Sequence, residues 1–221
     1  MTLKRPTRRI ADAAAKCARR LIYVPILHSP ADMGSLAEAM AAAIIDRFGR
    51  RHWEQYVTLL DGYWKTVRAE MEGLCLDYSQ VDLFQDGLPV CGKELELTQK
   101  AAAAGSENHQ LLLDLVARGA SLMGTEDPAL LLEEYRNVKA ALEHPQDATA
   151  STAGAPARPQ YKETLVKRDQ YMAKRIDASL RPGRIAVLFL GMMHKVDALL
   201  PADIVSTRLA WHDLQRGRKG G

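Results

Sequence analysis

Apolar residues along this chain fall into short continuous runs and longer stretches with helical spacing. The short runs are rich in β-branched or large apolar residues, which is typical of strands buried on both faces; they span 19–28, 81–86, 120–127, 184–191 and 203–211. The stretches between them have helical composition or an apolar stripe, at 36–48, 52–74, 93–103, 107–118, 128–142 and 161–180. Strands separated by helices predict an α/β fold, with a central, mostly parallel sheet flanked by helices on both faces.

Length and composition are compatible with this fold. A chain of 221 residues, 47% of them hydrophobic, suits one domain over 1–221 with a sizeable core. Segment 143–160 is rich in Pro, Ala, Ser, Thr and Gly and is expected to be a flexible surface loop. Much of the net charge of +3 comes from basic tails at 1–18 and 213–221. Because the body is then close to neutral, no nucleic-acid partner is expected.

Cysteines and apolar runs indicate the compartment. The three cysteines are unevenly spaced and form no CxxC pair, so a disulfide framework or structural zinc site is not expected. No apolar region of signal-peptide type follows the basic N-terminus, and no run approaches the roughly 20 residues that span a bilayer. The sequence therefore predicts a soluble, cytoplasmic protein with no membrane partner.

The stretch 52–74 carries more aromatic residues than one core stripe needs: Trp53, Tyr56, Tyr63 and Trp64. Two interpretations remain open, a homodimer face or simple packing in the core.

Four of the predicted strands lead into a side chain capable of chemistry: His28, Asp86, Glu126 and His194. The carboxyl ends of parallel strands share one sheet edge, so these four are expected to lie together. Neutral imidazole is a common metal ligand and a general base near working pH. Simpler roles stay open, since Asp86 sits in a turn before glycine and Glu126 precedes a helix.

Two further residues belong to this candidate site. Arg168 lies near the apolar stripe of helix 161–180, where it either meets an anion or extends to the margin of the stripe. Gly191 lacks a Cβ, which either permits close approach of a bound cofactor or ligand or marks a kink at the strand end.

Residues 191–194 read GMMH, and helix 161–180 with Arg168 precedes them. This arrangement resembles the TraB/Tiki, erythromycin-esterase and ChaN-like superfamily, whose members carry two GxxH motifs at strand ends, an acidic residue between them and an arginine. The first motif corresponds to PILH at 25–28, with proline in place of glycine. Asp86 lies where relatives generally have glutamate. The resemblance implies an α/β fold in which His28 and His194 face one cleft.

Members of this superfamily include metal-dependent proteases, lactone hydrolases and haem-binding proteins, so the resemblance implies a site more than a reaction. We expect a hydrolase of an ester, lactone or peptide-like bond in a small molecule or peptide, assisted by a divalent metal such as Mn, Co or Zn. His28, His194 and Glu126 would be its ligands, with Asp86 as the alternative acid. Arg168 would stabilise an oxyanion or orient a carboxylate. The alternatives are metal-free histidine catalysis, a binding protein for haem or a similar ligand, and an inactive regulatory relative.

Overall fold

The computed structural model describes residues 19–143 and 159–209. The basic tails expected at 1–18 and 213–221 lie outside the described residues. Most of the expected loop at 143–160 does so too, although its ends prove helical: α6 extends to Glu143 and α7 begins at Pro159.

The core of the fold is a sheet of five parallel strands in the order β3-β2-β4-β1-β5. The strands are β1 (Arg19–Ile26), β2 (Val81–Gln85), β3 (Ser121–Met123), β4 (Ile185–Gly191) and β5 (Ile204–Arg208). The sequence prediction of an α/β domain with a mostly parallel sheet is confirmed. The strands β1 and β3 end sooner than their apolar runs, so that His28 and Glu126 lie in the loops beyond them.

Six α-helices and three short 3₁₀ segments connect these strands in the described part of the chain. The helices are α2 (Ala37–Phe48), α3 (Arg50–Gly73), α4 (Glu94–Ala103), α5 (Glu107–Ala117), α6 (Pro128–Glu143) and α7 (Pro159–Ser179). The 3₁₀ segments are η1 (Pro30–Leu36), η2 (Tyr78–Gln80) and η3 (Val196–Leu199). No helix in the described ranges combines the length and apolar character needed to cross a membrane.

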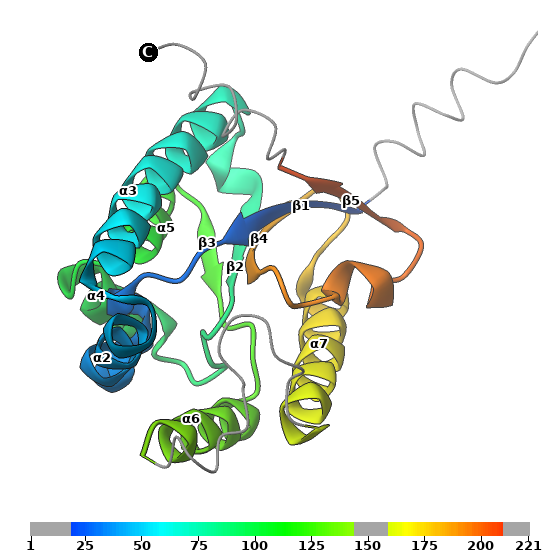
Figure 1. The fold of residues 1–221 in the computed structure, drawn as a ribbon. Coiled ribbons are helices and arrows are strands. Elements are labelled where there is room, and N and C mark those ends of the chain that lie inside the picture. Colours follow the sequence, from blue (N-terminus) through cyan, green and yellow to red (C-terminus); the bar gives the residue numbers. More distant parts are fainter. Residues whose placement is uncertain (1–18, 144–158, 210–221) are drawn as a thin grey trace, which may run out of the picture.

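Helices cover both faces of the sheet (Figure 1), because side chains of a strand alternate between its faces. On one face, Ile22, Val24 and Ile26 of β1 pack into a cluster with apolar residues of α3 and α5. On the other face, Leu21 and Tyr23 pack with apolar residues of α7. The central strands β1, β2 and β4 are therefore buried on both sides, as their continuous apolar runs indicate, whereas the edge strands β3 and β5 are more exposed.

The aromatic residues of α3 contribute to the first of these clusters. Tyr63 and Trp64 are buried in the core, where their rings meet edge to face. Trp53 and Tyr56 are partly buried. Two of the four aromatic residues are therefore explained by packing in the core. The homodimer stays a prediction.

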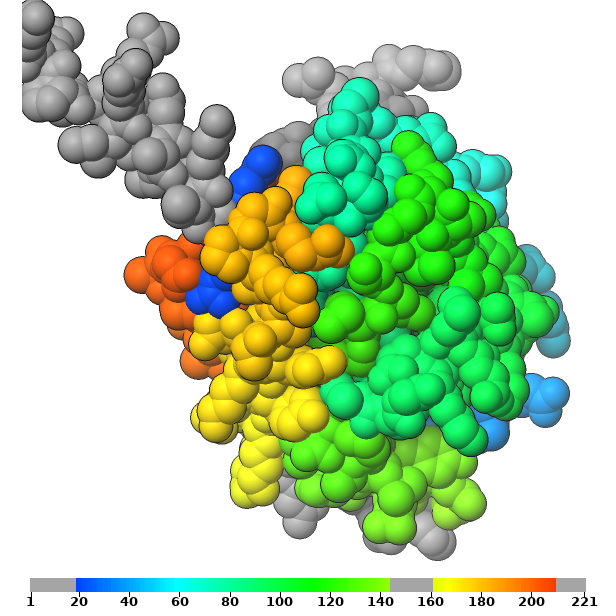
Figure 2. Space-filling view, turned by 180° about the vertical axis from the view of Figure 1, so that it is seen from behind, coloured from blue at the N-terminus to red at the C-terminus, as the bar shows by residue number. Residues whose placement is uncertain are grey.

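Because all strands are parallel, their carboxyl ends point to one edge of the sheet. Helices α2 and α6 lie at this edge in Figure 1, whereas α3, α5 and α7 run along the faces. Neither α2 nor α6 contains a fully buried residue. From the opposite side, Figure 2 shows α6 next to α7 at the surface.

Truncating the centre of the sheet is expected to destabilise the fold strongly. Leu188 of β4 is fully buried among residues of α7 and β1, so Leu188→Ala should lower the free energy of unfolding by about 2–5 kcal/mol. Leu59→Ala is the matched control, because Leu59 is exposed on α3 and should cost less than about 0.5 kcal/mol. Urea denaturation measures both values, and equal losses in the two variants would contradict the packing described.

Candidate functional site

Asp86 lies at the centre of the carboxyl edge, directly after β2. Its backbone N–H donates to the Phe189 carbonyl at 2.9 Å, which continues the ladder between β2 and β4 by one residue. Its carboxylate is buried, and its two oxygens bind different groups. Oδ1 accepts a bond from Arg168 Nη2 at 2.8 Å, and Oδ2 accepts the Gly191 backbone N–H at 3.0 Å. Both oxygens are thus fixed by groups on other elements.

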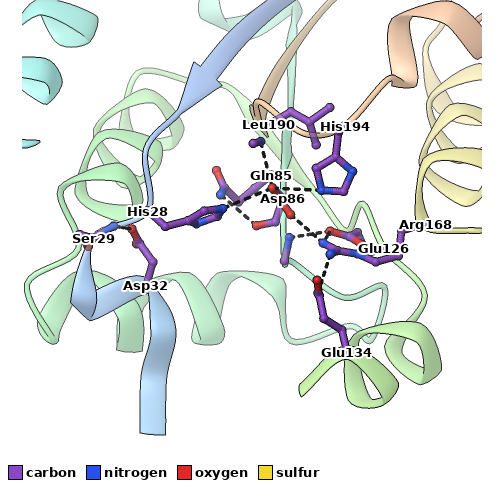
Figure 3. A network of polar contacts seen from close by, with 12 residues as sticks. His28, Ser29, Asp32, Gln85, Asp86, Glu126, Glu134, Arg168, Leu190 and His194 are labelled. Atoms are coloured by element: carbon purple, nitrogen blue, oxygen red, sulfur yellow. Dashed lines mark hydrogen bonds and ion pairs between the residues drawn. The ribbon is translucent and has the colours of Figure 1, made fainter. Parts of the chain in front are cut away.

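The two strand-end histidines flank this carboxylate (Figure 3). Nε2 of His28 lies 3.6 Å from Asp86 Oδ2, and Nε2 of His194 lies 3.5 Å from the same oxygen. His194 is buried, whereas 44% of the His28 side chain is exposed. The site therefore has a fixed imidazole inside and a more accessible one at the solvent side.

His194 is oriented by a residue that the sequence interpretation missed. Its Nδ1 lies 2.5 Å from Oδ1 of Asp169, whose Oδ2 accepts the Lys195 backbone N–H at 2.9 Å. A carboxylate at Nδ1 favours a proton on that nitrogen and orients the ring so that Nε2 faces Asp86. The spacing contained a usable signal, because Asp169 is four residues after Leu165 and three before Met172, and so lies beside the same apolar stripe as Arg168.

Arg168 is surrounded by carboxylates. Nε and Nη2 bind the two oxygens of Glu126 at 2.6 and 2.7 Å, Nη2 also binds Asp86, and Nη1 binds Glu134 of α6. Every nitrogen of the buried guanidinium has an anionic partner. Of the two roles expected for Arg168, orienting carboxylates matches these contacts.

Glu126 and Asp86 take different places around this arginine. Glu126 is fully buried, gives both oxygens to Arg168, and also accepts the Gly87 backbone N–H at 2.7 Å. Asp86 gives one oxygen to Arg168 and turns the other to the histidines. The structure thus brings together His28, His194 and Asp86, while Glu126 supports Arg168.

Gly191 forms the floor of this arrangement. A Cβ built at this position would lie 2.9 Å from Asp86 Oδ2, 3.4 Å from His28 Nε2 and 3.6 Å from His194 Cδ2. The absence of a side chain here is what lets both imidazoles approach the same carboxylate oxygen.

The ionisable groups of the site shift one another's pKa values. Burial lowers the pKa of His194, but the bond to Asp169 and the charge of Asp86 outweigh it, and the net pKa is raised. Burial likewise lowers the pKa of His28, and Asp86 reverses that shift. Burial raises the pKa of Asp86, yet the neighbouring histidines and Arg168 hold it well below its ordinary value. The site thus attracts positive charge to the space between the imidazoles and Asp86.

The donor atoms at this edge are of types that divalent cations bind. Two imidazole nitrogens face one carboxylate oxygen, and the connected network holds four carboxylates against a single guanidinium. Within 19–143 and 159–209 no three His, Cys, Asp or Glu side chains form a ready-made metal cage. His28 is the most exposed of these donors, with 44% of its side chain accessible to solvent.

The loop that carries His28 is anchored from two directions. Tyr56 of α3 donates to the His28 carbonyl at 2.7 Å. Asp32 accepts the Ser29 backbone N–H at 2.5 Å and the hydroxyl of Ser106, the N-cap of α5. These contacts fix the backbone of His28 although its side chain is partly exposed.

Adding a methyl group at residue 191 is expected to damage the site more than the fold. Gly191→Ala places Cβ against Asp86 and His28, so any activity of the site should fall sharply while circular dichroism stays unchanged. Gly62→Ala is the matched control: nothing lies within 4 Å of a Cβ there, and alanine should stabilise α3 by about 0.5–1 kcal/mol. Equal activity in both variants would contradict the close approach at Gly191.

Acid should weaken the anchor at Asp32. Burial raises the pKa of Asp32, but bonds from His109, Ser106 and Ser29 outweigh it, so the folded-state pKa lies below the ordinary value of 3.8. Stability from this carboxylate is then complete above the ordinary pKa and is lost as pH falls through the folded pKa. Asp32→Asn should cost about 1–3 kcal/mol at neutral pH. Urea titrations at several pH values should show this difference shrinking below about pH 4; a constant difference would contradict the assignment.

Comparisons of this chain with protein-family models, with curated proteins and with solved structures find no match. The functional interpretation therefore depends on the geometry of the site and on the motif resemblance alone.

Proposed function

We propose that this protein is a metal-assisted hydrolase of an ester, lactone or peptide-like bond. One observation carries the proposal: Nε2 of His28 and Nε2 of His194 both face Oδ2 of Asp86 above a glycine floor. A divalent cation between these three atoms would be bound by all of them, in place of the protons that the raised pKa values of both histidines favour.

His28, His194 and Asp86 would hold a divalent ion, and its Lewis acidity would be available to polarise a carbonyl and to acidify water. The chain's own residues prepare for it. Asp169 fixes the tautomer of His194, so that its Nε2 is free to bind. Gly191 N–H and Arg168 fix the two oxygens of Asp86, so that Oδ2 keeps its direction.

The geometry favours Asp86 as the third ligand in place of Glu126. Glu126 would have to release Arg168 before it could turn to the histidines, which would leave a buried arginine short of a partner. The supporting role of Glu126 is to keep Arg168, and through it Asp86, in position.

The motif resemblance supports the site more than the reaction: GMMH leads into His194 and Arg168 corresponds to the family arginine, and the superfamily includes metal-dependent proteases and lactone hydrolases. A substrate that is a small molecule or a peptide is part of this proposal, as is action in the cytoplasm. Exposed free thiols at Cys75 and Cys91 are compatible with a reducing compartment.

Metal content and hydrolysis test the proposal together. Wild type loaded with Mn²⁺, Co²⁺ or Zn²⁺ and then dialysed should retain about one ion per chain, while the double variant His28→Ala/His194→Ala retains none and stays folded. Hydrolysis of a panel of esters, lactones and peptides should fall at least about 100-fold in the double variant and about 10–100-fold in Asp169→Asn.

His52→Ala is the matched control, because His52 is exposed on α3 and belongs to no part of the site. It should keep both metal and activity. Equal metal content in wild type and in the double variant would contradict the proposal. If wild type mixed with hemin shows a Soret band that the double variant lacks, haem binding would replace the hydrolase as the proposed function.

A further inference from the structure

One of the three carboxylates around Arg168 is held differently from the other two. Glu126 is completely buried and bidentate, and Asp86 is 5% exposed and tied to the β4 backbone as well. Glu134 makes one bond to Nη1, and 23% of its side chain is exposed. Figure 3 shows Glu134 reaching Arg168 from a helix below the site. Glu134 is thus the partner that is easiest to remove.

The helix that presents Glu134 is loosely attached. No residue of α6 is fully buried, and Leu132 and Tyr135 are exposed. Among the described residues, the polar contacts of α6 with other elements include the Thr164 hydroxyl donating to Glu133 at 2.9 Å and the Tyr135 and Ser35 hydroxyls 3.0 Å apart. The exposed Tyr135–Ser35 contact contributes about 1 kcal/mol or less, whereas the bond from the buried Thr164 to the charged Glu133 contributes about 1.5–3 kcal/mol. Release of Glu134 to another carboxylate would not leave the buried Arg168 without an anion at Nη1.

The position of the Glu134 carboxylate is chemically suited to a ligand. It binds Nη1 of the guanidinium whose Nη2 binds Asp86, so another carboxylate in its place would share Arg168 with Asp86. Such an exchange keeps the charge of the network unchanged. It also satisfies Arg168 at every stage, which a neutral ligand would not do.

We propose that the Nη1 side of Arg168 is a subsite for a carboxylate group of the substrate, and that Glu134 occupies it until the substrate displaces it. The identity of the ligand as substrate rests on the proposed hydrolase function, whereas the subsite itself does not. The substrate class is then a carboxylate-bearing ester, lactone or peptide.

Acetate is the probe for this subsite, with acetamide as its neutral counterpart. The protein is first treated with a chelator, so that acetate has no metal to bind. It is then titrated with acetate or with acetamide. The Arg168 Nε–Hε resonance and the melting temperature are measured at each step. Glu134→Ala should bind acetate at least about tenfold more tightly than wild type does, because the competing carboxylate is gone. Acetamide should have no effect on either protein.

Glu133→Ala is the matched control, since it removes a neighbouring contact of α6 without touching Arg168. It should bind acetate no better than wild type. Glu134→Gln keeps the side-chain length and provides a second variant, with acetate affinity above that of wild type. Equal acetate affinity in the Glu134 and Glu133 variants, or an equal response to acetamide, would overturn the inference. Acetate binding as expected without any metal-dependent hydrolysis would contradict the proposed function alone.

Discussion

An arginine buried at the carboxyl edge of a parallel sheet needs anions around it, and the site of this protein is built on that requirement. Arg168 projects from α7 and meets Glu126 and Asp86, which lie just beyond β3 and β2. Removing one partner of such a buried pair costs about 3–5 kcal/mol, because a charge is left without compensation. The network therefore holds these elements in one relative position more firmly than apolar packing alone would.

This constraint determines what is left over for chemistry. Asp86 uses one oxygen for Arg168 and so presents the other toward His28 and His194. Asp169, the neighbour of Arg168 in sequence, fixes the ring of His194 from the same helix turn. One stretch of α7 thus orients both the buried carboxylate and the buried imidazole, while β1 contributes the more exposed histidine. Glu134 binds the remaining nitrogen of the guanidinium, Nη1, from helix α6, which has no fully buried residue.

The parallel sheet and the common edge were predictable, because apolar runs alternate with helical spacing and parallel strands end on the same side. The rule that parallel strands end at one edge predicts from the sequence alone that four residues share this edge: His28, Asp86, Glu126 and His194. It could not decide between Asp86 and Glu126. Asp86 and Glu126 each follow a short strand, and both carboxylates reach Arg168. Which of them keeps an oxygen for the histidines depends on side-chain rotamers and on the bond from the Gly191 N–H to Asp86.

Two residues were beyond this reasoning for different reasons. Asp169 has a local signal, its position beside the apolar stripe of α7, but this position does not show which group its carboxylate contacts. Glu134 had none, since it is one of several acidic residues on a helix whose contact with Arg168 arises only from tertiary packing.

The central claim is that His28 and His194 present Nε2 to one cation position shared with Asp86. Imidazole ¹⁵N spectra of the protein titrated with Zn²⁺ test it most directly. The account predicts that Nε2 of both histidines shifts together at one equivalence point, while Nδ1 of His194 stays protonated toward Asp169. A response from one histidine alone, or a shift of His194 at Nδ1, would contradict it.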